Sequence, residues 1–177
     1  AVDTSMGFTP LEGLVMGTRS GDLDPAISFF LNRHFDLKFS DIELLFNKES
    51  GLKGICGTND MREIIQRKQA GDKFAEIAVD IYCHRIKKYI GAYYAVLERV
   101  DGIIFTAGIG ENVPEIRELS CSGLTKLGIQ IDSQKNSGCR GGIGEIHSEK
   151  SEVKIMVIPT DEELKIARET EKLVKEL

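Results

Sequence analysis

One long amphipathic helix, predicted from about Asp72 to Leu97, limits most strongly how this chain can fold. Apolar residues recur there at steps of three and four, which places them along one side of an α-helix. We expect this stripe to be the main core-forming surface of the chain. Its members are Ala75, Val79, Tyr82, Ile86, Tyr89, Tyr93 and Leu97.

Two short apolar runs, residues 102–106 and 153–158, have the length and composition of strands. A junction from strand through loop to helix follows each run, first at Gly108, with the helix start at Asn112, and then at Thr160. Strands that alternate with helices indicate an α/β layered fold with a largely parallel sheet. Two clear strands are too few for a complete doubly wound sheet, so we expect a partial sheet with flanking helices and further chain toward the N-terminus.

Helix starts and loops can be predicted elsewhere in the chain. Capping residues, often next to a proline, predict helices that begin at Thr9, Asp24, Ser40, Asn112 and Thr160. Glycines predict loops over residues 51–62 and 138–144, and the alternation of Ile129 and Ile131 predicts a small strand.

Composition excludes several classes of function. The chain has 177 residues and a net charge of −5, with scattered basic residues, so a nucleic-acid partner is not expected. No apolar run is long enough to cross a bilayer, and the N-terminus lacks the features of a signal peptide. The four cysteines form no CxxC pair, and no histidine lies at zinc-ligand spacing from them. Free thiols and a cytoplasmic location are therefore expected.

A glycine-containing segment is the first candidate for binding. Gly108, Ile109, Gly110, Glu111 and Asn112 follow a predicted strand and precede a predicted helix. Glycines in such a place allow a ligand to approach the backbone, and ligands of open α/β sheets bind outside the carboxyl ends of the strands. The same pattern also suits a simple tight turn.

Four charged residues are further candidates, each with a plainer alternative. Arg19 could bind a phosphate or carboxylate, or pair with Asp22 or Asp24. Asp60 and Arg62 could contact a nucleoside, or pair with each other and cap a turn. Glu162 could face Mg²⁺ or its water shell, or simply interact favourably with the dipole at the N-terminus of its helix.

Three segments in order resemble the acetate kinase family, and the resemblance covers essentially the whole chain. They are residues 3–19 (DTSMGFTPLEGLVMGTR), residues 105–112 (FTAGIGEN) and residues 158–164 (IPTDEEL). The resemblance implies a ribonuclease-H-like, actin-like ATPase fold, in which ATP binds between two similar domains. It implies transfer of the γ-phosphoryl group of ATP to acetate, giving acetyl phosphate and ADP, with Mg²⁺.

The resemblance also implies roles for single residues. Arg19 is similar to the family's arginine that stabilises the transferring phosphoryl group. Asp60, Met61 and Arg62 resemble the adenosine-contacting segment, and residues 108–112 resemble a second nucleotide segment. Glu162 resembles the Mg²⁺-associated glutamate. The family's catalytic aspartate, its histidines and its first phosphate-binding stretch have no counterpart in the chain.

The resemblance further implies how the domains are divided. Residues 1–162 correspond to an N-terminally incomplete nucleotide-binding domain, the C-terminal one of the family. Residues 163–177 correspond to a helix that packs on the absent N-terminal domain, so its apolar face is expected to be exposed. A homodimer of the full-length enzyme is expected, and propionate or butyrate kinase activity or a non-catalytic nucleotide-binding module are the alternatives.

Overall fold

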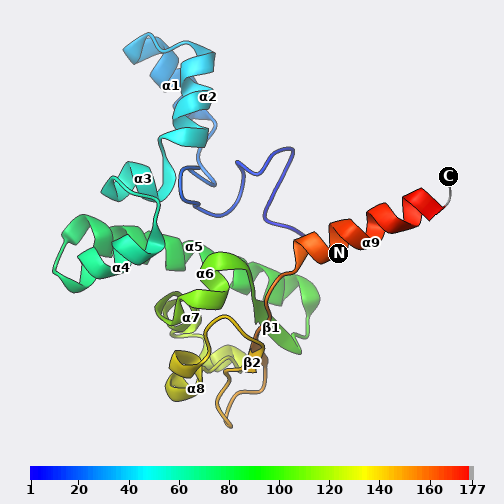
Figure 1. Cartoon of the computed structure of the whole chain (residues 1–177). Coiled ribbons are helices and arrows are strands. Elements are labelled where there is room, and N and C mark those ends of the chain that lie inside the picture. Colours follow the sequence, from blue (N-terminus) through cyan, green and yellow to red (C-terminus); the bar gives the residue numbers. More distant parts are fainter. Residues whose placement is uncertain (176–177) are drawn as a thin grey trace. The chain divides into compact units, whose positions relative to one another are not determined.

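A computed structural model describes residues 1–175 of the chain. The chain divides into two compact units, one from Ala1 to Val100 and one that begins at Asp101. Figure 1 shows that helices make up the regular structure of the first unit, whereas the second unit contains the sheet.

The first unit contains five helices among the described residues. The expected helices from Asp24, Ser40 and Asp72 are confirmed as α1, α2 and α5. Of the region 51–62 that the glycines had predicted as a loop, α3 occupies residues 51–56 and α4 begins at residue 61, so the prediction holds only for residues 57–60. The bounds are α1 Ala26–Phe35, α2 Phe39–Lys48, α3 Gly51–Cys56, α4 Met61–Gln69 and α5 Lys73–Leu97.

Helix α5 begins at a well-formed cap. The Asp72 side chain accepts hydrogen bonds from the backbone N–H groups of Phe74 (2.9 Å) and Ala75 (3.3 Å). Asp72 also pairs with Arg67 of α4 at 2.6 Å, and this guanidinium lowers the pKa of the Asp72 carboxyl. The cap therefore also fixes the turn between α4 and α5.

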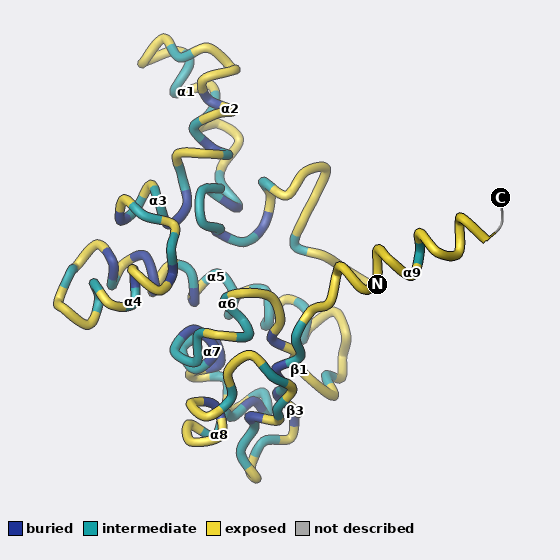
Figure 2. Tube along the Cα trace, in the orientation of Figure 1, coloured by how far each residue is buried: buried dark blue, intermediate teal, exposed yellow. Residues whose placement is uncertain are grey.

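The core of the first unit lies along the N-terminal half of α5. Ala75, Ala78 and Val79 are fully buried there, as are Leu52 of α3 and Ile64 of α4, the two helices that contact α5. Burial of the stripe decreases toward the C-terminal end of the helix, where Tyr89 and Tyr93 are half-buried and Leu97 is exposed. Figure 2 shows this change along α5. Only the first half of the predicted stripe is therefore core.

The helix expected from Thr9 is absent from the described chain. Residues 9–16 form turns and bends, because the Thr9 hydroxyl accepts a hydrogen bond from Leu11 N–H at 3.2 Å and closes a short local turn. Gly13 then adopts a φ of 98°, which no helix allows. The spacing of the capping box was present, but the glycine prevents the helix from continuing.

Among its described residues, the second unit contains a three-stranded sheet and five helical segments. Strand order is β1–β3–β2, and β1 pairs with β3 in parallel, from Gly102 opposite Lys154 to Phe105 opposite Val157. The expected partial sheet and a helix after each of its two strands are thus confirmed, but the predicted cap at Asn112 was wrong, because Asn112 ends α6 and α7 begins at Pro114. The bounds are β1 Gly102–Phe105, α6 Ala107–Asn112, α7 Pro114–Cys121, a 3₁₀ turn Thr125–Leu127, α8 Ser133–Gly138, β2 Gly144–Glu145, β3 Lys154–Val157 and α9 Glu162–Lys175.

Other details of this unit differ from the prediction. Strand β2 pairs antiparallel to β3, and Ile131 forms only an isolated bridge with His147. Strand β1 is not buried on both faces, because the Ile104 side chain is 58% exposed. Residues 108–112 form a short helix instead of a loop. Helix α9 has no buried residue, so its apolar side chains are exposed as expected.

None of the helices within residues 1–175 combines the length and the apolar character that a bilayer crossing requires. All four cysteines are free thiols.

The core of the second unit contains a fully buried charged side chain, that of Arg117 on α7. Its guanidinium donates hydrogen bonds to backbone carbonyls of Gly110 (2.8 Å), Glu111 (3.0 Å), Asn136 (2.8 Å) and Cys139 (2.7 Å). It also donates to the Asn136 side-chain oxygen at 2.7 Å. Burial lowers the pKa of Arg117. These bonds join the C-terminal ends of α6 and α8 to α7, where a cation is favoured by the helix dipoles.

We predict that Arg117→Met strongly destabilises the second unit. The substitution leaves several buried carbonyl groups without a donor, at about 1–3 kcal/mol for each group that finds no water, so a loss of roughly 3 kcal/mol or more is expected. Urea denaturation followed by circular dichroism measures it, with exposed Arg140→Met as the matched control. Equal unfolding midpoints for the two variants would show that the network contributes little.

Candidate functional site

The loop that carries Arg19 rests on the N-terminal end of α3. The first N–H groups of a helix lack partners within it, and here Leu52 donates to the Met16 carbonyl (3.0 Å) and Lys53 to the Gly17 carbonyl (2.9 Å). Just before the helix, Ser50 donates to the Thr18 carbonyl at 3.0 Å. The loop thus supplies the acceptors that the helix start needs, and its path is fixed by backbone bonds.

Gly51 makes this close approach possible. Its φ is 62°, and a Cβ at this position would lie 2.7 Å from the Arg19 carbonyl oxygen and still nearer to that of Met16. Because both obstacles are backbone atoms, no other residue fits without moving the loop. Gly51 was predicted to break a helix, whereas here it begins one.

The Arg19 guanidinium forms no ion pair within residues 1–175. Its nearest polar contact is a weak one with the Met16 sulfur, 3.7 Å from one of its terminal nitrogens. The two acids considered as partners are engaged elsewhere: Asp22 with Arg85 (3.1 Å), and Asp24 with the backbone N–H of Ala26 at the start of α1 (2.9 Å). The half-buried Arg19 side chain therefore keeps its donors available for an anion.

Asp60 and Arg62 pair with each other, as the plainer alternative had it. Two Arg62 nitrogens contact the Asp60 carboxylate at 3.0 and 2.6 Å, and the Arg62 N–H donates to it at 2.9 Å, which caps α4. Arg62 holds the pKa of the Asp60 carboxyl down at about 2. Between them, the Met61 side chain is buried in the core.

The first unit brings these two segments together. A Cβ at Gly17 would lie 3.1 Å from the Cβ of Asn59, so the backbone two residues before Arg19 passes close to the residue before Asp60. The loop with Arg19 and the start of α4 are therefore neighbours.

The second unit brings together the other two candidates, because β1 and β3 are parallel. Their carboxyl ends lie at one edge of the sheet, where Ile158 N–H donates to the Phe105 carbonyl at 3.0 Å. The Glu111 carboxylate at the end of α6 accepts hydrogen bonds from the Thr160 N–H (3.0 Å) and hydroxyl (3.4 Å). Residues 108–112 are thus tied to the segment that precedes Glu162.

Helix α6 begins with an unusual backbone conformation. Ala107 has a φ of 58°, in the left-handed region that costs a residue with a Cβ of order 1–3 kcal/mol. The helix then passes so near the strand that a Cβ at Gly110 would lie 3.3 Å from the Phe105 carbonyl carbon. The segment therefore has a defined conformation, and Gly108 within it is exposed.

The cap of α9 is Asp161, and the prediction of a cap at Thr160 was wrong. Asp161 accepts a hydrogen bond from the Leu164 N–H at 2.9 Å, whereas the Thr160 hydroxyl is bonded to Glu111. Glu162 and Glu163 are exposed and line an open hollow of about 390 Å³ with Thr160 and Asp161.

These carboxylates fit a supporting role at Mg²⁺. Within the described residues, no three His, Cys, Asp or Glu side chains are grouped to hold a metal. Mg²⁺ in kinases is typically held by one or two carboxylates, water and substrate phosphates, so one exposed glutamate is chemically sufficient for such a part. Glu162 thus suits a metal that arrives with a nucleotide.

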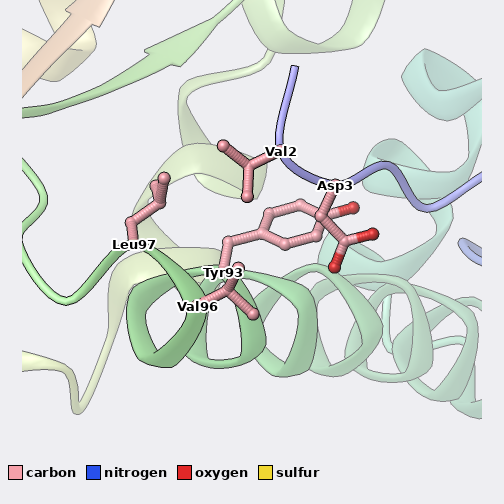
Figure 3. A pocket seen from close by; sticks show the side chains of 5 residues that line it. All are labelled: Val2, Asp3, Tyr93, Val96 and Leu97. Carbon is pink, nitrogen blue, oxygen red and sulfur yellow. The ribbon is translucent and has the colours of Figure 1, made fainter.

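An apolar hollow of about 200 Å³ lies elsewhere in the first unit. It is lined by Val2, Asp3, Tyr93, Val96 and Leu97, and Figure 3 shows the Tyr93 ring rising from α5 toward the N-terminal segment. Its walls offer no cationic side chain for a phosphate.

Sequence reasoning did not foresee two polar networks. Arg85, one of the scattered basic residues, contacts Asp22 from the middle of α5, and Arg117 is buried. Since the first contact spans 63 residues, no local pattern shows it.

The comparisons with known proteins agree on one family. A profile described as the acetokinase family matches residues 1–168. An acetate kinase of Syntrophobacter fumaroxidans is 56% identical over 96% of this chain and 41% of its own length. One of Sulfurovum sp. is 51% identical over the whole of this chain and 45% of its own. The chain thus spans less than half the length of these relatives.

Solved structures give the same result. The crystal structure of Porphyromonas gingivalis acetate kinase has a TM-score of 0.91 and 44% identity, over 96% of this chain and 43% of that one. A propionate kinase from Francisella tularensis has a TM-score of 0.89 and 47% identity, over 94% and 42%. With matches of this extent in both sequence and fold, the chain belongs to the acetokinase family.

Proposed function

We propose that this chain supplies the adenosine site and part of the phosphoryl-transfer site of an acetate kinase. The reaction is the reversible transfer of the γ-phosphoryl group of ATP to acetate, which gives acetyl phosphate and ADP. The observation that carries the proposal is the guanidinium of Arg19, half-buried on a fixed loop and without a carboxylate partner in residues 1–175. The acetate kinases that match nearly all of the chain support it.

Arg19 would act on the transferring phosphoryl group. In such transfers negative charge is spread over the equatorial oxygens, and catalysis rests on positioning and electrostatic stabilisation. A guanidinium offers donors in a rigid fork that matches these oxygens. Because the backbone around Arg19 is held by α3, the side chain would need little reorganisation to reach them.

The nucleotide would contact two segments, residues 60–62 and residues 108–112. In the first, the paired Asp60 and Arg62 present polar groups at the start of α4, whereas Met61 contributes through its backbone because its side chain is buried. In the second, exposed Gly108 allows close approach. Ile109, Gly110 and Asn112 complete the segment, while Glu111 holds Thr160.

Glu162 would orient the water shell of Mg²⁺ or bind the ion through one oxygen. The ion neutralises charge on the phosphates when it is bound. The contribution of this chain is to keep the glutamate at the edge of the sheet, through the bond from Thr160 to Glu111.

The remaining proposals concern the whole protein. Residues 1–162 would belong to the nucleotide-binding domain, and the helix from residue 163 onward would pack its apolar face on the other domain. Ile166, Leu173 and Val174, each about two-thirds exposed, support this. A homodimeric, cytoplasmic full-length enzyme without a nucleic-acid partner remains the expectation.

Propionate kinase activity is the second candidate, favoured by the Francisella tularensis propionate kinase that matches the chain at 47% identity. Competition between acetate and propionate in the full-length enzyme separates the two. A non-catalytic nucleotide-binding module is the third reading, and an active full-length protein would exclude it.

Arg19→Ala in the full-length enzyme should lower kcat by about two to three orders of magnitude, because one preorganised charge contact to the transition state is lost. The KM for ATP should change little. Steady-state rates of acetyl phosphate formation measure both constants, with exposed Arg33→Ala on α1 as the control. A raised KM with kcat unchanged would contradict the role.

Glu162→Ala in the full-length enzyme should raise the Mg²⁺ concentration required for half-maximal rate. Asp161→Ala should instead lower the free energy of unfolding by ~1 kcal/mol, because it removes the cap of α9, and should leave the Mg²⁺ dependence as in wild type. If Glu162→Ala also keeps the wild-type dependence of rate on Mg²⁺ concentration, the only role of Glu162 is its interaction with the dipole of α9.

A further inference from the structure

The Asp22 side chain is the meeting point of a loop and a helix that lie far apart in sequence. Its carboxylate accepts hydrogen bonds from Arg85 (3.1 Å) and from the Tyr89 hydroxyl (2.9 Å), both on α5. Arg85 donates a second bond to the Asp22 backbone carbonyl at 2.8 Å. Arg85 and Tyr89 are four residues apart on the helix, so they lie on the same face, and both donate to the same carboxylate oxygen.

Asp22 also closes the loop that carries Arg19. Its backbone N–H donates to the Gly13 carbonyl at 2.9 Å, and its carboxylate accepts from the Gly13 N–H at 2.8 Å. The two backbone segments that close the loop approach each other so nearly that only glycine fits at position 21. Gly21 has a φ of 70°, and a Cβ there would lie 2.6 Å from the Gly13 carbonyl oxygen. Residues 13–22 therefore form a closed loop, anchored to α5 at its base.

The loop is held on both sides of Arg19. On one side, Met16 and Gly17 accept hydrogen bonds from the start of α3. On the other side, Ser20 N–H donates to the Phe46 carbonyl of α2 at 3.0 Å, and Asp22 anchors the base of the loop to α5. The Arg19 carbonyl itself accepts a hydrogen bond from Met16 N–H at 3.1 Å. Loss of the Asp22 contacts would free the base of the loop from α5 and leave the backbone contacts next to Arg19 in place.

The bonds at Asp22 are partly shielded from water, which strengthens them. Asp22, Arg85 and Tyr89 are half-buried, and burial together with the Asp22 carboxylate raises the pKa of Tyr89 to about 12. A hydrogen bond with an ionised partner is roughly twice as strong as one between neutral groups. An amide in place of the carboxylate would bring an NH₂ donor toward the donors of Arg85 and Tyr89.

We propose that Asp22 is a positioning residue for Arg19: by anchoring the base of the loop to Arg85 and Tyr89, it holds the guanidinium where the phosphoryl group is transferred. The inference rests on the proposed function for the catalytic role of Arg19. It assigns to Asp22, Arg85 and Tyr89 a role in the reaction, although none of them would touch the nucleotide or acetate.

A double-mutant cycle in the full-length enzyme tests the proposal. Asp22→Asn should lower kcat by about tenfold to a hundredfold, the effect of a displaced catalytic group, with the KM for ATP nearly unchanged. In the Arg19→Ala background the same substitution should have almost no further effect on kcat, because Asp22 acts through Arg19. Tyr89→Phe should give a smaller effect with the same dependence, and exposed Asp80→Asn on α5 should have none.

A merely stabilising role would give a different result. Asp22→Asn would then reduce kcat by the same factor in both backgrounds, and that outcome would overturn the inference. If Arg19→Ala alone leaves kcat unchanged, the proposed function of Arg19 fails instead.

A direct observation of Arg19 keeps the two failures separate. In ¹⁵N NMR spectra of this chain, Asp22→Asn should shift or broaden the Nε resonance of Arg19, whereas Asp80→Asn should not. An Arg19 resonance that stays unchanged in Asp22→Asn would refute the positioning role, whatever the kinetics of the full-length enzyme show.

Discussion

The parallel pairing of β1 with β3 fixes the geometry of the second unit. Parallel strands end at the same edge of a sheet, so the segments that follow them must lie side by side. The register from Gly102–Lys154 to Phe105–Val157 therefore brings residues 108–112 and Glu162 together, although they are some 50 residues apart in sequence. The hydrogen bonds between Thr160 and Glu111 join the two segments directly. Arg117 of α7 holds the C-terminal end of α6 through its bond to the Gly110 carbonyl.

In the first unit, backbone hydrogen bonds fix the position of the loop that carries Arg19. The free N–H groups at the start of α3 determine where the loop before Arg19 lies, and Gly51 allows the contact because it has no Cβ. Asp22 fixes the other end of the loop on α5. In the first unit Arg19 is thus carried by an irregular segment whose backbone is held by regular elements, which is how loops can position functional groups. In the second unit the candidates lie on the short helix α6 and at the first residue of α9.

The sequence predicted the features that depend on local patterns. Helix α5, the two main strands and the helices after them follow from periodicity, caps and glycines, and residues 105–112 carry the family resemblance. Prediction from the sequence failed where a contact with a distant segment determines the local conformation. Gly51 begins a helix because the distant loop at residues 16–17 accepts hydrogen bonds from the two N–H groups that follow Gly51. Thr160 does not cap α9 because its hydroxyl is bonded to Glu111. The network around Asp22 joins residues 63 and 67 positions apart, so no window of sequence contains it.

Titration of this chain with ADP, followed by NMR of its backbone amides, tests most directly whether these segments form the adenosine side of a kinase site. The account predicts weak, saturable binding with shifts concentrated in residues 60–62 and 108–112. Shifts that avoid both segments, or that centre on the apolar hollow at Tyr93, would contradict it.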